Sequence, residues 1–296
     1  MTPSLRPTLA NWNGELMPLD DVKVSVLDRS FLFGDAAYEA MRIYSGRAWL
    51  ADEHFARFNQ SLSEIHIAAD LDRLRRRMDE TILASGVEEG LVYLQVTRGQ
   101  GPRSHAWKSA MTPNELIWVQ DYGGDPFAEL RRSGTGVVVV PDRRWGRPDV
   151  KSVNLLANCM ACQIAYESGC IEAILIDDAG LVTEATHSSF FAVLDGVVRT
   201  SPNDVRVLPG VTRNWVVDRM RRAGRRVEES PIRKSDLGDV DELFLTGTSI
   251  EVMPIIAVDG RPVGSGTPGP ISERLVAEYQ AALEDFRTSK VSVRSA

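Results

Sequence analysis

A single lysine, Lys151, stands in the stretch RPDVKSVNLLANCMACQIA (147–165), directly ahead of an apolar run. The chain has 34 lysines and arginines together, and only five of them are lysines. An arginine-rich genome would also make lysine rare, but the two side chains differ in what they can do. Lysine can lose its proton and act as an amine nucleophile, whereas arginine stays protonated. Lys151 is therefore a candidate for covalent amine chemistry.

Two turns rich in glycine and hydroxyl groups have the composition of an anion site. LPGVTRNWVV places Gly210, Val211 and Thr212 at the start of a predicted helix, where free backbone N–H groups and a hydroxyl suit one phosphate. In LTGTSIEV, Thr248 and Ser249 follow a predicted strand. An ordinary glycine turn with Thr212 as helix N-cap has the same composition, so the prediction depends on the two turns converging.

Further charged side chains add possible binding groups. Glu184, at a strand end in LVTEATHSSFF, is either an exposed carboxylate or the partner of a protonated ring nitrogen. Arg57 in EHFARF is either a solvated helix cation or a phosphate clamp. Arg103 and His105 lie on the long loop GQGPRSHAWKSAMTPN, where they suit the capture of a carboxylate.

An amine, a phosphate cradle and a carboxylate are together what pyridoxal phosphate requires. The chain has no GxxxxGK[ST] and no convincing GxGxxG, which argues against P-loop and Rossmann nucleotide sites. Cys159 and Cys162 form a CxxC without the second CxxC or histidine pair of a metal site. Because both lie in a helical apolar pattern, we predict small buried packing residues and no metal.

Composition limits the class of protein. The chain has 296 residues, a net charge of −7 and a pI near 5.3, which argue against a nucleic-acid or anionic-membrane partner. No apolar run approaches the roughly 20 residues of a membrane-spanning helix. The N-terminal stretch lacks the apolar core of a signal peptide, so we expect a cytoplasmic protein.

Hydrophobic periodicity predicts an α+β protein of two domains. Strands are predicted at 22–28, in a hairpin over 36–50 that turns at Ser45-Gly46, and at 91–99, 115–122, 135–142, 173–177, 181–185, 189–196, 197–201 and in DELFLTG. Helices are predicted at 51–67, 71–86, 153–168, 211–224 and 271–286, with a loose tail after them. Many hairpins mixed with helices argue against a doubly wound parallel sheet. We predict a smaller N-terminal α/β domain (1–122), a linker (123–135) and a larger cofactor-binding domain (136–296).

The chain resembles the class IV (fold type IV) aminotransferases, a group that includes D-amino acid transaminases, branched-chain aminotransferases and aminodeoxychorismate lyase. The matching pieces occur in family order from about residue 20 to 260. They are LDRSFLFGDAAYEAMRIYSG, EHFARF, YLQVTRGQGPRSHAW, DRRWGRPDVKSVNLLAN, EAILIDDAGLVTEATHSSFF, LPGVTR and DELFLTGTSIEVMPI. The resemblance implies two α/β domains with pyridoxal 5'-phosphate between them. It also implies a homodimer whose partner loop reaches the active site.

The resemblance also assigns roles to residues. Lys151 would form the Schiff base with the cofactor, Glu184 would bind the pyridine nitrogen, and Arg144 would orient Glu184. Leu208 would support the ring. The phosphate would be held by Arg57, by the Gly210, Val211 and Thr212 turn and by the Thr248-Ser249 turn.

Substrate class follows from the long loop. Tyr38, Arg103 and His105 match the carboxylate trap of D-amino acid transaminases, and Gln95 stands where branched-chain enzymes have an arginine. The resemblance therefore favours ping-pong transfer of an amino group between a D-amino acid and a 2-oxo acid. The alternatives are a branched-chain aminotransferase, an (R)-amine transaminase, a lyase, or a catalytically idle binding protein on this fold. The chain departs from the usual pattern after Glu184, where it has His187 and Ser189, and Arg42 is a further cation near the expected pocket.

Overall fold

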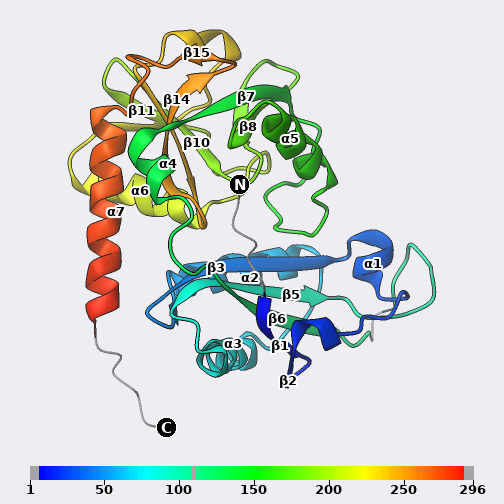
Figure 1. Ribbon diagram of the computed structural model, residues 1–296. Helices are drawn as coiled ribbons and strands as arrows, with labels where there is room; N and C mark the ends of the chain where they lie inside the picture. The colour runs from blue at the N-terminus through cyan, green and yellow to red at the C-terminus, as the bar shows by residue number, and fades with distance from the viewer. Residues whose placement is uncertain (1–6, 109–110, 290–296) are drawn as a thin grey trace.

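The computed structural model describes residues 7–108 and 111–289, and it consists of two β-sheets with helices on their faces. In Figure 1 the smaller sheet, built from the N-terminal part of the chain, lies below the larger sheet. The connection that carries Lys151 contacts β3 of the smaller sheet through an isolated bridge between Ser152 and Ala37. The predicted α+β character is confirmed, whereas the predicted domain boundaries remain a prediction.

The smaller sheet has six strands in the order β2-β1-β6-β5-β3-β4, and its strand pairs are antiparallel. They are β1 (Pro7–Trp12), β2 (Glu15–Met17), β3 (Ala36–Tyr44), β4 (Arg47–Ala48), β5 (Glu89–Thr97) and β6 (Asn114–Asp121). Helices α2 (Ala51–Glu64) and α3 (Leu71–Ser85) pack on it through apolar residues at helical spacing, such as Leu74, Met78 and Ile82. Asp70 caps α3 at its N-terminus.

The larger sheet has nine strands in the order β12-β11-β10-β13-β14-β7-β8-β9, with β15 beside β14. They are β7 (Thr135–Pro141), β8 (Glu172–Ile176), β9 (Val182–Ala185), β10 (Ser189–Leu194), β11 (Val197–Thr200), β12 (Val227–Glu229), β13 (Glu242–Gly247), β14 (Glu251–Val258) and β15 (Arg261–Pro262). Only the pairs β7–β8, β7–β14 and β11–β12 are parallel among the described strands. Helices α5 (Leu156–Glu167) and α6 (Val211–Arg222) pack against it.

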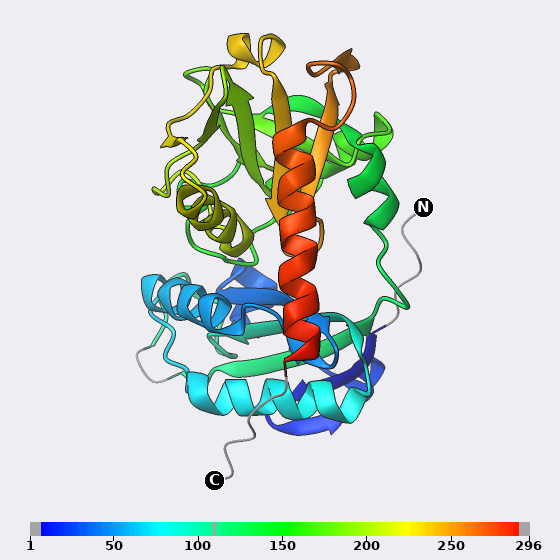
Figure 2. The same ribbon diagram turned by 90° about the vertical axis from the view of Figure 1, so that its left-hand side faces the viewer.

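The long helix α7 (Pro270–Thr288) contacts both sheets. Figure 2 shows it running vertically from the larger sheet down to the smaller one. Leu275, Tyr279 and Leu283 face the core at a spacing of four residues, so one stripe of the helix is buried. Trp49, just after β4, donates to the Tyr279 hydroxyl at 2.8 Å, and Arg287 pairs with Glu89 of β5. The end of the chain therefore joins the two halves.

Some predicted elements are wrong. Residues 22–28 form no strand, because Val24, Val26 and Leu27 are exposed and their alternation marks no buried face. The segment 123–135 includes a short helix, α4 (Ala128–Ser133), that packs on β14. Strands β1, β2, β12, β14 and β15 were not predicted. Most of the tail predicted to be loose lies outside the described residues.

Within the described residues, no helix is long and apolar enough to cross a membrane. A search of the same residues finds no group of three or more His, Cys, Asp or Glu side chains placed to hold a metal ion.

Candidate active site

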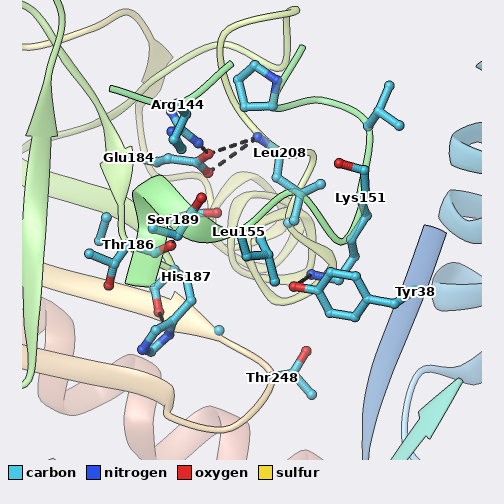
Figure 3. Close-up of a pocket in the computed structure, with 18 of the residues that line it drawn as sticks. Tyr38, Arg144, Lys151, Leu155, Glu184, Thr186, His187, Ser189, Leu208 and Thr248 are labelled. Atoms are coloured by element: carbon cyan, nitrogen blue, oxygen red, sulfur yellow. Dashed lines mark hydrogen bonds and ion pairs between the residues drawn. The ribbon is translucent and has the colours of Figure 1, made fainter. Parts of the chain in front are cut away.

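A pocket of about 270 Å³ is lined by residues from both halves of the molecule. The smaller half contributes Tyr38 of β3 and Arg57 of α2. The larger half contributes the 144–155 connection, α5, the end of β9 with the turn after it, the 208–212 segment and the turn after β13. Figure 3 shows Lys151 and Tyr38 on one side, Arg144, Glu184 and Leu208 along the top, and His187 and Thr248 below.

Lys151 is fixed by backbone contacts with the smaller half. Its carbonyl accepts from the Tyr38 N–H at 3.0 Å, and its N–H donates to the Ser61 hydroxyl at 3.0 Å. The Nζ atom lies 3.2 Å from the Tyr38 hydroxyl and 4.3 Å from the centre of that ring. The amine is half-buried inside the pocket, where it can reach a small carbonyl compound.

Glu184 is buried on the opposite side of the pocket from the Lys151 amine, and Arg144 pairs with it directly. Arg144 is itself held by Asp142, with Nη2 at 2.7 Å from Oδ2. The Leu208 N–H donates to both Glu184 oxygens, at 3.2 and 3.3 Å. Burial raises the pKa of Glu184 to about 7, although Arg144 and the Leu208 N–H act in the opposite direction. A cation placed beside this carboxyl group would relieve that cost.

One wall of the pocket has groups that could hold an anion, and they are called the anion cradle below. Arg57 lies against the segment before α6, with Nη1 3.2 Å from the Pro209 carbonyl. Gly210 precedes α6 as its N-cap, and no side chain caps the free N–H groups of that helix. A Cβ at Gly210 would lie 2.5 Å from the Ser189 hydroxyl, so this close approach requires glycine. The Thr246 hydroxyl, which also lines the pocket, is buried without a hydrogen-bond partner.

The structure brings most of the sequence-predicted site residues together. The residues that line the pocket are Tyr38, Arg57, Arg144, Lys151, Glu184, Leu208, Gly210, Val211, Thr212 and Thr248. Ser249 does not line it; its carbonyl instead accepts from Arg42 Nη1 at 3.4 Å.

Arg103 and His105 do not line the pocket of their own chain. The buried Arg29 fixes the backbone of their loop, because its guanidinium donates to the carbonyls of Ser104 and His105. Arg103 and His105 both lie against the Phe33 ring, at 5.7 and 5.5 Å from its centre. Arg29 thus fixes the loop backbone, while the side chains of Arg103 and His105 stay exposed.

The prediction that Cys159 and Cys162 are buried packing residues is wrong. Both thiols are free, Cys159 is exposed, and both line the pocket. The core face of α5 is made instead by Ala161 and Ala165, so the cysteines project from another face. Trp145, Asn158, Thr186, His187, Ser188 and Ser189 also line the pocket and were not selected. Among them, His187 could have been selected from the sequence, because it departs from the usual family pattern after Glu184.

A family model described as amino-transferase class IV matches residues 36–258. The chain belongs to the class IV aminotransferase family. This confirms the sequence-based family prediction, and with it a transaminase that uses pyridoxal phosphate.

Curated relatives and solved structures agree with the family. The D-alanine aminotransferase of Bacillus licheniformis is 36% identical over 274 residues, which cover 92% of this chain and 96% of that protein. The D-alanine aminotransferase of Listeria innocua is 35% identical and covers 89% and 92% of the two chains. The branched-chain amino acid aminotransferase of Escherichia coli superposes with a TM-score of 0.89 at 23% identity over 97% of this chain and 98% of that one, which shows the shared fold.

Proposed function

We propose that this protein is a pyridoxal-phosphate-dependent aminotransferase that moves an amino group between a D-amino acid and a 2-oxo acid. The observation that carries the proposal is the arrangement of the Lys151 amine, the Glu184 carboxyl group and the anion cradle around one pocket. The D-alanine aminotransferase relatives support the substrate class.

The residues fit the cofactor. Lys151 would hold its carbonyl carbon, Glu184 its ring nitrogen, and Arg57 with the N-terminus of α6 its phosphate. The buried Thr246 hydroxyl has no hydrogen-bond partner, and a bound phosphate would supply one. The pKa of Glu184 is raised, and a protonated ring nitrogen beside it would stabilise the charged carboxylate. When bound, pyridoxal phosphate supplies the electron sink for the reaction.

The chain's own residues supply proton transfer and orientation. The Lys151 amine would remove the proton from the substrate α-carbon and return it on the cofactor side, since Lys151 is the lysine that lines the pocket. The Tyr38 hydroxyl, 3.2 Å from Nζ, orients the amine. Glu184 would keep the ring nitrogen protonated, and Arg144 and Leu208 hold Glu184 in place.

We further propose a homodimer in which the partner subunit's Arg103 and the partner subunit's His105 bind the substrate α-carboxylate. Both residues are exposed and lie outside their own pocket. The same side of the molecule in Figure 1 carries α1 (Arg29–Phe33), the loop and α5. It exposes Phe31 from α1 and an apolar stripe on α5, formed by Leu156, Met160 and Ile164 at a spacing of four residues. A second copy would cover this face.

We place the enzyme in the cytoplasm, where its three free cysteines would stay reduced. Its partners would be the amino acid and the 2-oxo acid, with no nucleic acid or membrane.

The test is a half-reaction panel. The cofactor-loaded enzyme is mixed with D-alanine, D-glutamate, L-leucine and (R)-phenylethylamine, and the visible absorbance of the lysine-bound cofactor is followed. We expect the two D-amino acids to bleach it. Bleaching by L-leucine and by neither D-amino acid would replace the proposal with the branched-chain alternative. A Lys151→Ala variant should fold and lack the absorbance band, while Lys234→Ala, at an exposed lysine, should behave as the wild type.

A further inference from the structure

His187 is a pocket residue that the reaction described above does not use. It lies in the turn between β9 and β10, its side chain is 54% exposed, and it lines the pocket near the bottom of Figure 3. The α-carboxylate, phosphate and ring nitrogen already have their partners in the proposed function. An imidazole at this position therefore needs another explanation.

The buried carboxylate of Glu172 contacts both the backbone and the ring of His187. Glu172 of β8 has no exposed surface, and it accepts hydrogen bonds from the Thr186 hydroxyl at 2.9 Å, the His187 N–H at 3.0 Å and the Ser188 hydroxyl. One of its oxygens lies 3.3 Å from His187 Nδ1. Because Nδ1 faces Glu172, Nε2 is the ring nitrogen that can contact the Cys162 side chain or an anion in the pocket.

The groups around the His187 ring shift the pKa of its imidazole. Burial opposes protonation, but the charge of Glu172 and a hydrogen bond with the Cys162 side chain raise the pKa of His187 above its ordinary value, while the charge of Lys151 acts against them. These three groups are the titratable neighbours from β8, α5 and the 144–155 connection. Thr248, in the turn after β13, also lines the pocket and does not titrate.

We propose that His187, fixed by Glu172, is a specificity-determining residue that binds a second carboxylate, carried by the side chain of the substrate. The inference rests on the proposed transaminase function and adds the charge of the side chain that the pocket selects. The preferred substrates are then dicarboxylic amino acids and dicarboxylic 2-oxo acids. The preference decreases as the pH rises through the pKa of His187, because the neutral ring loses the charge-assisted part of the hydrogen bond.

The experiment compares the wild-type holoenzyme with His187→Asn and uses D-glutamate and D-glutamine, which match in shape and differ in charge. In the variant we expect the ratio of kcat/KM for D-glutamate over D-glutamine to fall roughly ten- to hundredfold. D-alanine turnover and pyridoxal phosphate affinity should stay within about threefold, and the pH dependence of the ratio should vanish. His66→Asn, the same change at an exposed histidine, is the matched control.

Two results would overturn the assignment. One is an unchanged ratio in His187→Asn. The other is weakened pyridoxal phosphate binding with equal losses for all substrates, which would make His187 a phosphate contact. A calorimetric titration of the holoenzyme with glutarate distinguishes a failure of the His187 assignment from a failure of the proposed function. Should the wild type process no D-amino acid, a wild-type-specific affinity for glutarate would still support His187, and its absence would refute it.

Discussion

Glu39 of β3 and Arg57 of α2 form a two-pronged ion pair, with Arg57 Nε 2.7 Å from Oε1 and Nη2 2.9 Å from Oε2. Both side chains are buried. Burial would raise the pKa of Glu39, but the charges and hydrogen bonds of Arg57 and His54 together outweigh it and hold that pKa far below its ordinary value. The smaller half therefore fixes the cation that faces the N-terminus of α6 in the larger half.

We expect Glu39→Gln to weaken cofactor binding. The amide would leave Arg57 buried without a carboxylate partner, which costs about 3–5 kcal/mol of unfolding free energy. The guanidinium would also lose its fixed direction toward the phosphate, so the dissociation constant of pyridoxal phosphate should rise about tenfold or more. Urea unfolding and fluorescence titration of the cofactor-free protein measure both. Asp52→Asn removes the exposed Asp52–Arg75 pair and should change neither, and equal effects of the two variants would contradict the assignment.

The pKa of Glu184 predicts a pH-dependent stability of the cofactor-free protein. Its ordinary value is 4.5 and burial raises it to about 7, so the folded state binds this proton more tightly than the unfolded state does. The contribution is fully present below pH 4.5 and is lost as the pH rises through about 7. Relative to Glu184→Gln, the wild type should lose about 3 kcal/mol of unfolding free energy over that window. Parallel pH curves for the two proteins would show that the carboxyl group is not shifted. Glu53→Gln, at an exposed glutamate, should follow the wild type.

Arg103→Ala should impair substrates with an α-carboxylate and spare simple amines. We expect the KM for D-alanine to rise roughly ten- to hundredfold, because a charge-assisted contact is lost. The half-reaction with (R)-phenylethylamine should change little. Arg261→Ala, at an exposed arginine outside the pocket, is the control.

Subunit mixing determines which copy supplies Arg103. When inactive Lys151→Ala and impaired Arg103→Ala protomers are unfolded together and refolded, half of the dimers are hybrids. If the arginine comes from the partner, each hybrid has one intact site, and about a quarter of wild-type activity returns. If each chain serves its own pocket, mixing restores nothing.

Met160→Glu should disrupt the homodimer. Met160 is 63% exposed at the centre of the α5 stripe, and a buried unpaired carboxylate at a subunit interface is strongly unfavourable. Light scattering should show a monomer with turnover greatly reduced, because the partner loop would be absent. Leu83→Glu introduces the same charge at an exposed leucine of α3 and should leave the mass unchanged; a Met160→Glu variant that keeps the wild-type mass would place the interface elsewhere.

Helices with a regular apolar stripe were predicted best from the sequence, since α2, α3, α6 and α7 each follow a spacing of three and four residues. Strand β14 was missed because it is buried along most of its length, so it has no alternation, and it contains Pro254. The residues around Lys151 were predicted through their similarity to a known family. The place of His187 in the pocket was not predicted, because it departs from the family pattern. The pocket-facing cysteines were missed for another reason: the helix face that lines a cavity depends on how the helix packs.

The contacts of α7 with both sheets also set an order of events during synthesis. The smaller sheet and its helices come from the first part of the chain and can pack as they leave the ribosome. The contacts of Tyr279 with Trp49 and of Arg287 with Glu89 require α7 to be translated. A nascent chain stalled before residue 270 would therefore have Lys151 and the cradle residues, but it would lack the α7 contacts that join the two halves.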